Sequence, residues 1–390
     1  MKIKEVNAFI VDASWRNWIF LKVETDSGFV GWGECTLEGR ENAVVGAIED
    51  MKRSVIGQDP RKIREIVYGL TRHGYWDVGP VISSAVAGIE MALWDISGKV
   101  LNVPVHQLLG GSVRERIEVY SNGWSFGAIE PKEFANRASS TVKLGFRGLK
   151  FDPFGQAGST IRTEELQIAI ERVRAVREAV GPQVQILIEC HGRFDSPSAR
   201  LVAKALMPFE PRFIEEPLPP GDLGVQGSLA SAIEIPIAGG ERFYSPSECL
   251  SALASGGISI LQADVIHVGG ISALMAAAAI ADVYRVPIAP HNASGPIATA
   301  ATLQVSAVVP NFYLQEMFAP EDAPWRHTVA TPPILVENGS VSVPSGPGLG
   351  IEIDEVVSQA HPFVPRDLAM YDSENSILAN PLSRSDSEMR

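Results

Sequence analysis

Three glutamates stand at equal intervals in the middle of the sequence, and each one closes a short apolar run. Glu189 ends QILIE, Glu215 ends FIE and Glu241 follows IPIAGG, with 26 positions between one glutamate and the next. About that many residues form one strand, one helix and two short loops in an α/β barrel. Since successive parallel strands all end at the barrel mouth, this spacing predicts that the three carboxylates lie together there. The simpler alternative is that three unrelated acids cap the helices that follow.

The region from residue 116 to residue 330 alternates between strand-like and helical segments. Helical patterns over 164–180 and 271–284 are examples, and Gly and Pro punctuate the strand ends, as tight βα turns require. The strand-like runs are IEVYSN, GLKFD, QILIEC, RFIEE, PIAGG, ILQAD, PIAPH and FYLQE. Strands and helices in this order predict an α/β barrel.

Residues 1–115 are predicted to form a separate α+β domain, because strands come first and helices follow. Asp26-Ser27-Gly28 is a hairpin turn signal, and a helical pattern over 81–100 ends before Asn102. The strands are predicted over 3–11, 18–24 and 29–34, and the helices between 38 and 110.

Residues 331–390 do not continue the alternation. They contain a predicted strand pair around Glu337-Asn338-Gly339, then the Pro/Gly-rich stretch VPSGPGLGIEID and a polar tail. An irregular segment of this kind has to pack against another part of the chain. The N-terminal domain is the nearest candidate.

Composition excludes some classes of partner. A formal net charge of −13 argues against sequence-independent binding of nucleic acid, which needs a basic surface. The start, MKIKEVNAFIVDA, has no long apolar core, so neither a signal peptide nor a membrane span is predicted. Three widely spaced cysteines (Cys35, Cys190 and Cys249) do not resemble a zinc set and indicate reduced thiols. We therefore expect a soluble cytoplasmic protein.

The predicted strand ends are more polar than structure alone requires. Active sites of α/β barrels lie at these ends. Three carboxylates gathered there repel one another, and the ordinary remedy is a hard divalent cation with oxygen ligands. The strand-end residues are Asn122, Lys150, Asp152, Glu189, His191, Glu215, Glu241, Asp264, His291 and Glu316.

Two neighbouring strand ends predict a general base. Asp264 ends the sixth run and His291 the seventh, so the carboxylate can lie against one imidazole nitrogen while the other nitrogen takes a proton. Alternatively, His291 caps the helix that follows. His267 lies beyond the strand end and is predicted to be structural.

Alternation along a strand predicts two further pairs. Lys150 and Asp152 are two residues apart, as are Glu189 and His191, so each pair can share one strand face. Lys150 could instead be a surface charge paired with Asp152. Arg193 either holds an anionic substrate group or caps a helix. Glu316 also has two alternative roles: it either hydrogen-bonds the carboxylate of a bound substrate or forms a stabilising pair at the surface.

Several motifs together resemble the enolase superfamily, and within it the mandelate racemase subgroup near its acid-sugar dehydratases. The resemblance covers essentially the whole chain. The motifs are AVAGIEMALWDISGKVLNVPVHQLLGG, FIEEPLPP, AGGERF, ILQADVIHVGGIS, APHNASGP and PGLGIEID.

The resemblance implies a modified (β/α)7β barrel with a capping domain built from both termini. It also implies Mg²⁺ held by Glu189, Glu215 and Glu241, with Asp264 and His291 as a catalytic dyad. Cap loops near 12–18 and 73–78, the latter with Trp76, would select the substrate, and homo-oligomers are common in the family. This chain departs from the family pattern in two places: the usual first metal ligand is aspartate rather than Glu189, and the second lysine of the racemase pattern is replaced by Asp152.

These residues favour dehydration of a small sugar acid. His291 would remove the proton α to the carboxylate, Lys150 would add a positive charge, and His191 would protonate the departing 3-hydroxyl. Racemisation needs a second base, and Asp152 beside Lys150 is a poor one. The enzyme alternatives are an epimerase or racemase and a lactone cycloisomerase. A catalytically silent sugar-acid-binding protein is the alternative of another class.

Overall fold

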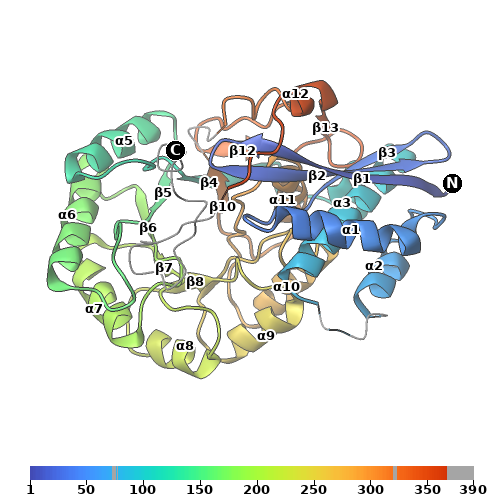
Figure 1. Cartoon of the computed structure of the whole chain (residues 1–390). Coiled ribbons are helices and arrows are strands. Elements are labelled where there is room, and N and C mark those ends of the chain that lie inside the picture. Colours follow the sequence, from blue (N-terminus) through green and yellow to red (C-terminus); the bar gives the residue numbers. More distant parts are fainter. Residues whose placement is uncertain (73–75, 77, 319–322, 367–390) are drawn as a thin grey trace, which may run out of the picture.

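The computed structural model describes residues 1–72, 76, 78–318 and 323–366. The chain begins with an antiparallel sheet in the order β1-β2-β3, and helices pack against it to form an N-terminal unit beside the barrel (Figure 1). Its strands are β1 (Ile3–Ala13), β2 (Arg16–Thr25) and β3 (Val30–Glu34). Its helices are α1 (Glu41–Val55), α2 (Ile63–Arg72), α3 (Pro80–Leu101) and α4 (Val105–Leu108).

Helix α3 lies directly on the backbone of β3. A Cβ at Gly33 would come within 1.8 Å of the carbonyl oxygen of Gly88, so only glycine permits this approach. The contact brings the end of β3 and the middle of α3 to the edge of the barrel. Helix α3 is also the one described helix long and apolar enough to cross a membrane by length and composition, and 83% of its apolar window is buried inside the protein.

The barrel is a parallel sheet in the order β10-β4-β5-β6-β7-β8-β9. Its strands are β4 (Arg116–Asn122), β5 (Gly148–Phe151), β6 (Gln185–Glu189), β7 (Phe213–Glu215), β8 (Ile237–Gly239), β9 (Ile260–Leu261) and β10 (Gln315–Phe318). The predicted run PIAPH is not a full strand. Instead, Ile288 alone forms parallel bridges to Leu261 and to Phe312. These bridges join β9 to the segment that leads into β10, and the predicted barrel is confirmed.

Helices alternate with the strands around the outside of the barrel (Figure 1). They are α5 (Pro131–Lys143), α6 (Thr163–Val180), α7 (Ser196–Leu206), the short η1 (Met207–Phe209), α8 (Leu223–Ala230), α9 (Pro246–Ala254), α10 (Ile271–Val283) and α11 (Pro296–Val308). The two helices predicted from periodicity differ from α6 and α10 by one residue at one end.

Each barrel strand sends alternate side chains inward and outward. The inward ones form a single apolar cluster: Tyr120, Leu187, Phe213, Ala238, Ile260, Ala289 and Leu314. Outward residues such as Ile188, Cys190 and Ile214 belong to a second cluster that includes residues of the surrounding helices. Because the side-chain period of a strand is two, the next inward positions toward the strand ends form a layer directly above the apolar cluster.

The C-terminal segment touches both parts of the molecule. It contains β11 (Ala330–Thr331), β12 (Ser340–Ser342), β13 (Glu352–Ile353) and α12 (Glu355–Gln359). The predicted strand pair around Glu337-Asn338-Gly339 does not form a full hairpin. Only a single bridge joins Glu337 to Ser340, and β12 pairs antiparallel with β4 of the barrel. Further along, Trp32 of β3 donates to Glu352 at 2.7 Å, so this part packs on the N-terminal unit.

Candidate active site

The layer above the apolar cluster holds most of the polar residues predicted from the strand ends. Glu189 follows Leu187 by two positions, Glu215 follows Phe213, and His291 follows Ala289. Strand periodicity therefore explains why the carboxylates and the imidazole face the same interior space. Glu241 is the exception, because it lies beyond the end of β8 in a turn.

The three equally spaced glutamates lie together. One carboxylate oxygen of each of Glu189, Glu215 and Glu241 lies within 4.8 Å of the other two. Glu215 is fully buried, and burial together with neighbouring Glu189 raises the pKa of Glu215 to about 8. Gln262 donates to the second oxygen of Glu215 at 2.6 Å, which orients that carboxylate.

Lys150 lies inside this acidic cluster and not at the surface. Its Nζ is 2.7 Å from Glu215, 3.2 Å from Glu189 and 2.8 Å from Glu316, and the residue is 1% exposed. Burial alone would lower the pKa of Lys150, but Glu215 and Glu316 raise it well above its ordinary value. The alternative of a surface ammonium paired with Asp152 is therefore wrong.

The donor set suits a hard divalent cation. Carboxylate oxygens are the ligands that Mg²⁺ and Ca²⁺ take in proteins. Three of them converge here, and the Lys150 ammonium already sits against two of their carboxylates as a positive counter-charge. Glu189 reaches the cluster although it replaces the more usual aspartate, so the extra methylene is accommodated.

Asp264 and His291 form a hydrogen-bonded pair. Nδ1 of His291 is 2.8 Å from Asp264, and the backbone N–H of Ile266 donates to the other oxygen of Asp264 at 2.6 Å. Nε2 of His291 points to the glutamate cluster, 3.4 Å from Glu241. Burial lowers the pKa of His291, whereas Glu241 and Glu316 raise it, and the result lies well above the ordinary value.

His191 is a second imidazole beside the glutamate cluster, and it lies next to Glu189. The backbone N–H of His191 donates to Glu189 at 2.7 Å, and its Nδ1 is 3.1 Å from Asp152. Burial lowers the pKa of His191, but Glu189 and Asp152 raise it to about 9. The prediction that Glu189 and His191 share one strand face by alternation is wrong, because β6 ends at Glu189 and His191 has a left-handed φ of 53°.

Arg193 is directed away from the cluster of glutamates. Its guanidinium pairs with Asp152 and donates to the carbonyl oxygen of Gly155 at 2.8 Å, with a side chain only 1% exposed. Because its guanidinium is buried and bonded to these partners, Arg193 neither caps a helix nor presents its N–H groups to an anionic group of a substrate. Its place in the structure is to hold Asp152 beside His191.

Asn122 and Glu316 lie next to Lys150. Asn122 donates to Glu316 at 2.6 Å, and the backbone N–H of Asn292 donates to the other oxygen at 3.0 Å. Glu316 is fully buried, so its alternative role in a surface pair is wrong. Burial raises the pKa of Glu316, but Lys150 and His291 lower it to about 2.

The predicted cap loop near 73–78 lies mostly outside the described residues. Of this loop Trp76 and Val78 are described, and 81% of the surface of Trp76 is exposed.

Sequence reasoning missed two side chains that touch the site. Gln262 contacts Glu215, and its position two residues before Asp264 on the same run was the available signal. His267 was predicted to be structural, and its ring stacks on that of His291 with centroids 6.2 Å apart. Its Nδ1 is 2.9 Å from the carbonyl oxygen of Glu241, so His267 joins two loops of the site.

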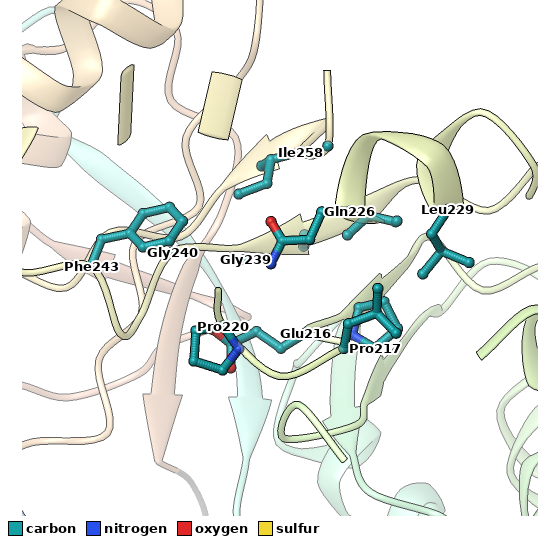
Figure 2. Close-up of a pocket in the computed structure, with 13 residues that line it drawn as sticks. Glu216, Pro217, Pro220, Gln226, Leu229, Gly239, Gly240, Phe243 and Ile258 are labelled. Carbon is teal, nitrogen blue, oxygen red and sulfur yellow. The ribbon is translucent and has the colours of Figure 1, made fainter. Parts of the chain in front are cut away.

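A pocket lies on the other side of the strands that carry these carboxylates. It is lined by Glu216 and not by Glu215, and Gln226 and Leu229 of α8 contribute to it, so it opens between the barrel strands and the outer helices. Figure 2 shows Phe243 and Leu229 at opposite ends of this pocket. The pocket is separate from the cluster of glutamates and imidazoles.

Comparison with known families divides the chain into two matched regions. Residues 9–110 match the N-terminal domain of the mandelate racemase / muconate lactonizing enzyme family. Residues 133–357 match the enolase C-terminal domain-like family. The first region lies in the N-terminal unit, and the second contains most of the barrel.

Individual proteins of known name are also similar. The chain is 37% identical to D-gluconate dehydratase of Thermoproteus tenax over 94% of this chain and 75% of that protein. It is 38% identical to D-galactonate dehydratase of Pectobacterium atrosepticum over 91% of this chain and 93% of that protein. Among solved structures, a mandelate racemase/muconate lactonizing enzyme from Sulfitobacter sp. matches with a TM-score of 0.89 and 31% identity, covering 95% of this chain and 98% of that one. An enolase superfamily member from Salmonella Typhimurium matches with a TM-score of 0.88 and 30% identity, covering 93% and 98%.

Proposed function

The chain belongs to the mandelate racemase / muconate lactonizing enzyme family of the enolase superfamily, and we propose that it is a hydro-lyase that dehydrates a sugar acid. One observation carries the proposal. Two imidazoles, each paired with its own carboxylate, border one acidic cluster: His291 with Asp264 beside Glu241, and His191 beside Glu189. A dehydration needs one base and one acid, and this arrangement supplies a candidate for each. Relatives named as gluconate and galactonate dehydratases support the same reaction class.

Glu189, Glu215 and Glu241 would hold a Mg²⁺ ion. When bound, such an ion supplies positive charge that offsets the negative charge developing on the carboxylate of the substrate. Lys150 adds a positive charge from the chain itself, since its ammonium touches the same cluster. The proton α to the carboxylate is otherwise very weakly acidic, and these positive charges allow an ordinary side-chain base to remove it.

His291 is the proposed base. Asp264 accepts a hydrogen bond from Nδ1, so the neutral form of His291 keeps its proton on Nδ1 and offers Nε2 as the base. Mg²⁺ bound by Glu241 would offset the negative charge that raises the pKa of His291 in the metal-free protein. Nε2 is 3.4 Å from Glu241, at the edge of the acidic cluster, where the carboxyl end of a substrate would lie. The α-carbon, one bond from that carboxyl group, would then be within reach of Nε2.

His191 is the proposed acid. Asp152 accepts from Nδ1 of His191 and is itself held by Arg193, so the imidazole has a fixed orientation. A proton from His191 would leave with the 3-hydroxyl group as water, while the electrons of the broken Cα–H bond form the new double bond. The enol that results tautomerises to a 2-keto-3-deoxy acid.

Asn122, Glu316 and Trp76 are proposed to contact the substrate, with Asp152 and Arg193 acting behind His191. We also propose that residues 1–115, together with the C-terminal segment of residues 331–390, of which 331–366 are described, cap the barrel of residues 116–330 and select among sugar acids. The partner would be a small aldonate or aldarate, with no nucleic acid or membrane involved. A cytoplasmic homo-oligomer remains our prediction for the assembly.

A substrate panel tests the reaction class. We expect incubation with aldonates and aldarates plus Mg²⁺ to yield a 2-keto-3-deoxy acid, measured as its semicarbazone, and expect chelation to abolish the product. The chelated enzyme should recover when Mg²⁺ is returned in excess. If no acid is dehydrated while α-protons exchange with deuterated solvent, an epimerase or cycloisomerase replaces the proposal.

Changing His191 to Asn should separate the two proton transfers. We expect product formation to fall by about 10²–10⁴-fold, because general acid catalysis is lost. Exchange of the α-proton into deuterated solvent should persist, because His291 still removes and returns that proton. Mass spectrometry of the recovered substrate measures the exchange. Equal loss of both activities would show that His191 does not act as the acid alone.

A further inference from the structure

The N-termini of two barrel helices are capped from outside the barrel. Neighbouring helices use their own N-cap side chains: Asp195 accepts from the first turn of α7, Asp222 from that of α8 and Ser245 from that of α9. Helices α10 and α11 begin instead at Gly270 and Gly295, neither of which has a capping side chain. The first backbone N–H groups of a helix require acceptors, so another residue must supply them.

Glu34, the last residue of β3, supplies the acceptors for α11. The backbone N–H of Gly295 donates to Oε1 of Glu34 at 2.6 Å, and that of Ala298 donates to Oε2 at 2.9 Å. Thr36 donates a further hydrogen bond to Oε1 at 2.7 Å. Glu34 is fully buried, so its carboxylate is shielded from solvent. It caps a helix that begins 261 residues further along the chain.

Glu90, in the middle of α3, supplies the acceptors for α10. The N–H groups of Ile271 and Ser272 donate to its two oxygens at 2.8 and 2.9 Å, and Trp94 donates to Oε1 at 2.7 Å. Ser83 lies on the same face of α3, seven residues earlier, and donates to the carbonyl oxygen of His267 at 2.7 Å. Helix α3 therefore holds the start of α10 and the loop before it.

Glycine at the two N-cap positions makes room for the incoming carboxylates. A Cβ on Gly270 would lie 2.5 Å from Oε2 of Glu90, and one on Gly295 would lie 2.8 Å from Oε1 of Glu34. Gly270 also has a φ of 104°, which residues with side chains rarely adopt. A side chain at either N-cap position would therefore compete for space with the acid that already caps the helix.

The two loops that end in these caps carry the base and its partner. His291 lies four residues before Gly295, and Asp264 lies six residues before Gly270. We infer that Glu34 and Glu90 are positioning residues, which hold the loops of His291 and Asp264 so that docking of the N-terminal unit assembles the proposed base. This inference rests on the proposed function.

Two of the proposed metal ligands provide an internal comparison. Glu189 and Glu215 lie on β6 and β7, and neither contacts Glu34 or Glu90 through any described hydrogen bond. The third glutamate, Glu241, is reached from the Asp264 loop through His267, and Asn292 of the His291 loop donates to Glu316. Loss of a cap should therefore lower kcat more than it raises KM.

The test compares cap removal with a matched change in the same helix. Asp95 of α3 is also fully buried and also accepts two backbone N–H groups, from Trp32 at 2.9 Å and Leu349 at 2.8 Å, but it touches neither loop. We would compare Glu34→Ala, Glu34→Gln, Glu90→Ala and Glu90→Gln with Asp95→Asn. The readouts are hydrogen exchange of residues 264–272, 291–299 and 185–193, and kcat and KM on the substrate that the panel identifies.

We expect each Ala variant to exchange faster in its own loop only, and to lose about 10–100-fold in kcat with KM changed less than about twofold. The Gln variants keep one acceptor oxygen and should recover part of the rate. Asp95→Asn should unfold more easily and keep its kcat within about twofold. The inference is overturned if the Ala variants lose no more kcat than Asp95→Asn, or if exchange in the two loops is unchanged. If the wild-type enzyme dehydrates no sugar acid, the proposed function fails, and hydrogen exchange alone then decides whether the caps hold the loops.

Discussion

His291→Asn is expected to lower kcat by about 10⁴-fold and to abolish α-proton exchange with solvent. Asparagine can still hydrogen-bond Asp264, but it cannot accept a proton at the position of Nε2. General base catalysis contributes about 10²–10⁴-fold in enzymes, and the weak acidity of a proton α to a carboxylate places this site at the upper end. Turnover and deuterium incorporation, measured on the same substrate, check the two effects together.

A second buried imidazole provides the control. His106 on α4 bonds Gln304 through Nδ1 at 2.8 Å, and Gln304 lies eight residues into α11, or about 12 Å along its axis. His106→Asn should reduce stability and leave kcat unchanged for the folded fraction. Comparable kcat losses in both variants would mean that the effect reports folding, and His291 would no longer be the base.

Lys150→Met is expected to destabilise the metal-free protein by about 3–5 kcal/mol. Its ammonium is the buried counter-charge for Glu215, Glu189 and Glu316, and removing one partner of a buried ion pair leaves uncompensated charge. Mg²⁺ held by the glutamates should restore part of this stability, because it supplies positive charge to two of the same carboxylates. Denaturant unfolding with and without Mg²⁺ measures the difference.

A lysine that is less buried provides the control for this substitution. The Lys22 side chain is 20% exposed, and its Nζ lies 2.8 Å from Glu24 and 2.7 Å from Glu355 in the N-terminal unit. Lys22→Met should cost no more than about 1 kcal/mol, with or without Mg²⁺. Should Lys150→Met cost equally little, or show no response to Mg²⁺, the ammonium and the cation do not share these carboxylates.

The barrel and most of the cluster could be predicted because both follow from strand periodicity. Interior residues such as Leu187 and Phe213 alternate with outward ones, and the next inward positions are Glu189 and Glu215. A repeat of strand, helix and loops of constant length then brings those positions to one mouth. Local pattern and global fold agree at these residues, so the sequence alone was sufficient.

Prediction failed where the chain leaves regular structure. His191 adopts a left-handed conformation just beyond β6, so its direction does not follow from alternation. Of the seventh predicted strand, only Ile288 forms bridges, and the pattern of its run does not distinguish it from the runs that form full strands. Arg193 and Glu34 have partners distant in sequence, and no local pattern encodes such contacts.

Helices α10 and α11 begin at glycine, and this limits how the N-terminal unit and the barrel can be exchanged between homologues. A chimera that joins the first hundred residues of one homologue to the barrel of another keeps its fold contacts only if the donor brings acids that match the recipient's Gly270 and Gly295. Glu34 with Gly295, and Glu90 with Gly270, thus form two pairs of residues, and both members of each pair should come from the same parent protein. We expect that the loops proposed to select the substrate can be exchanged within the N-terminal unit as long as both pairs stay intact.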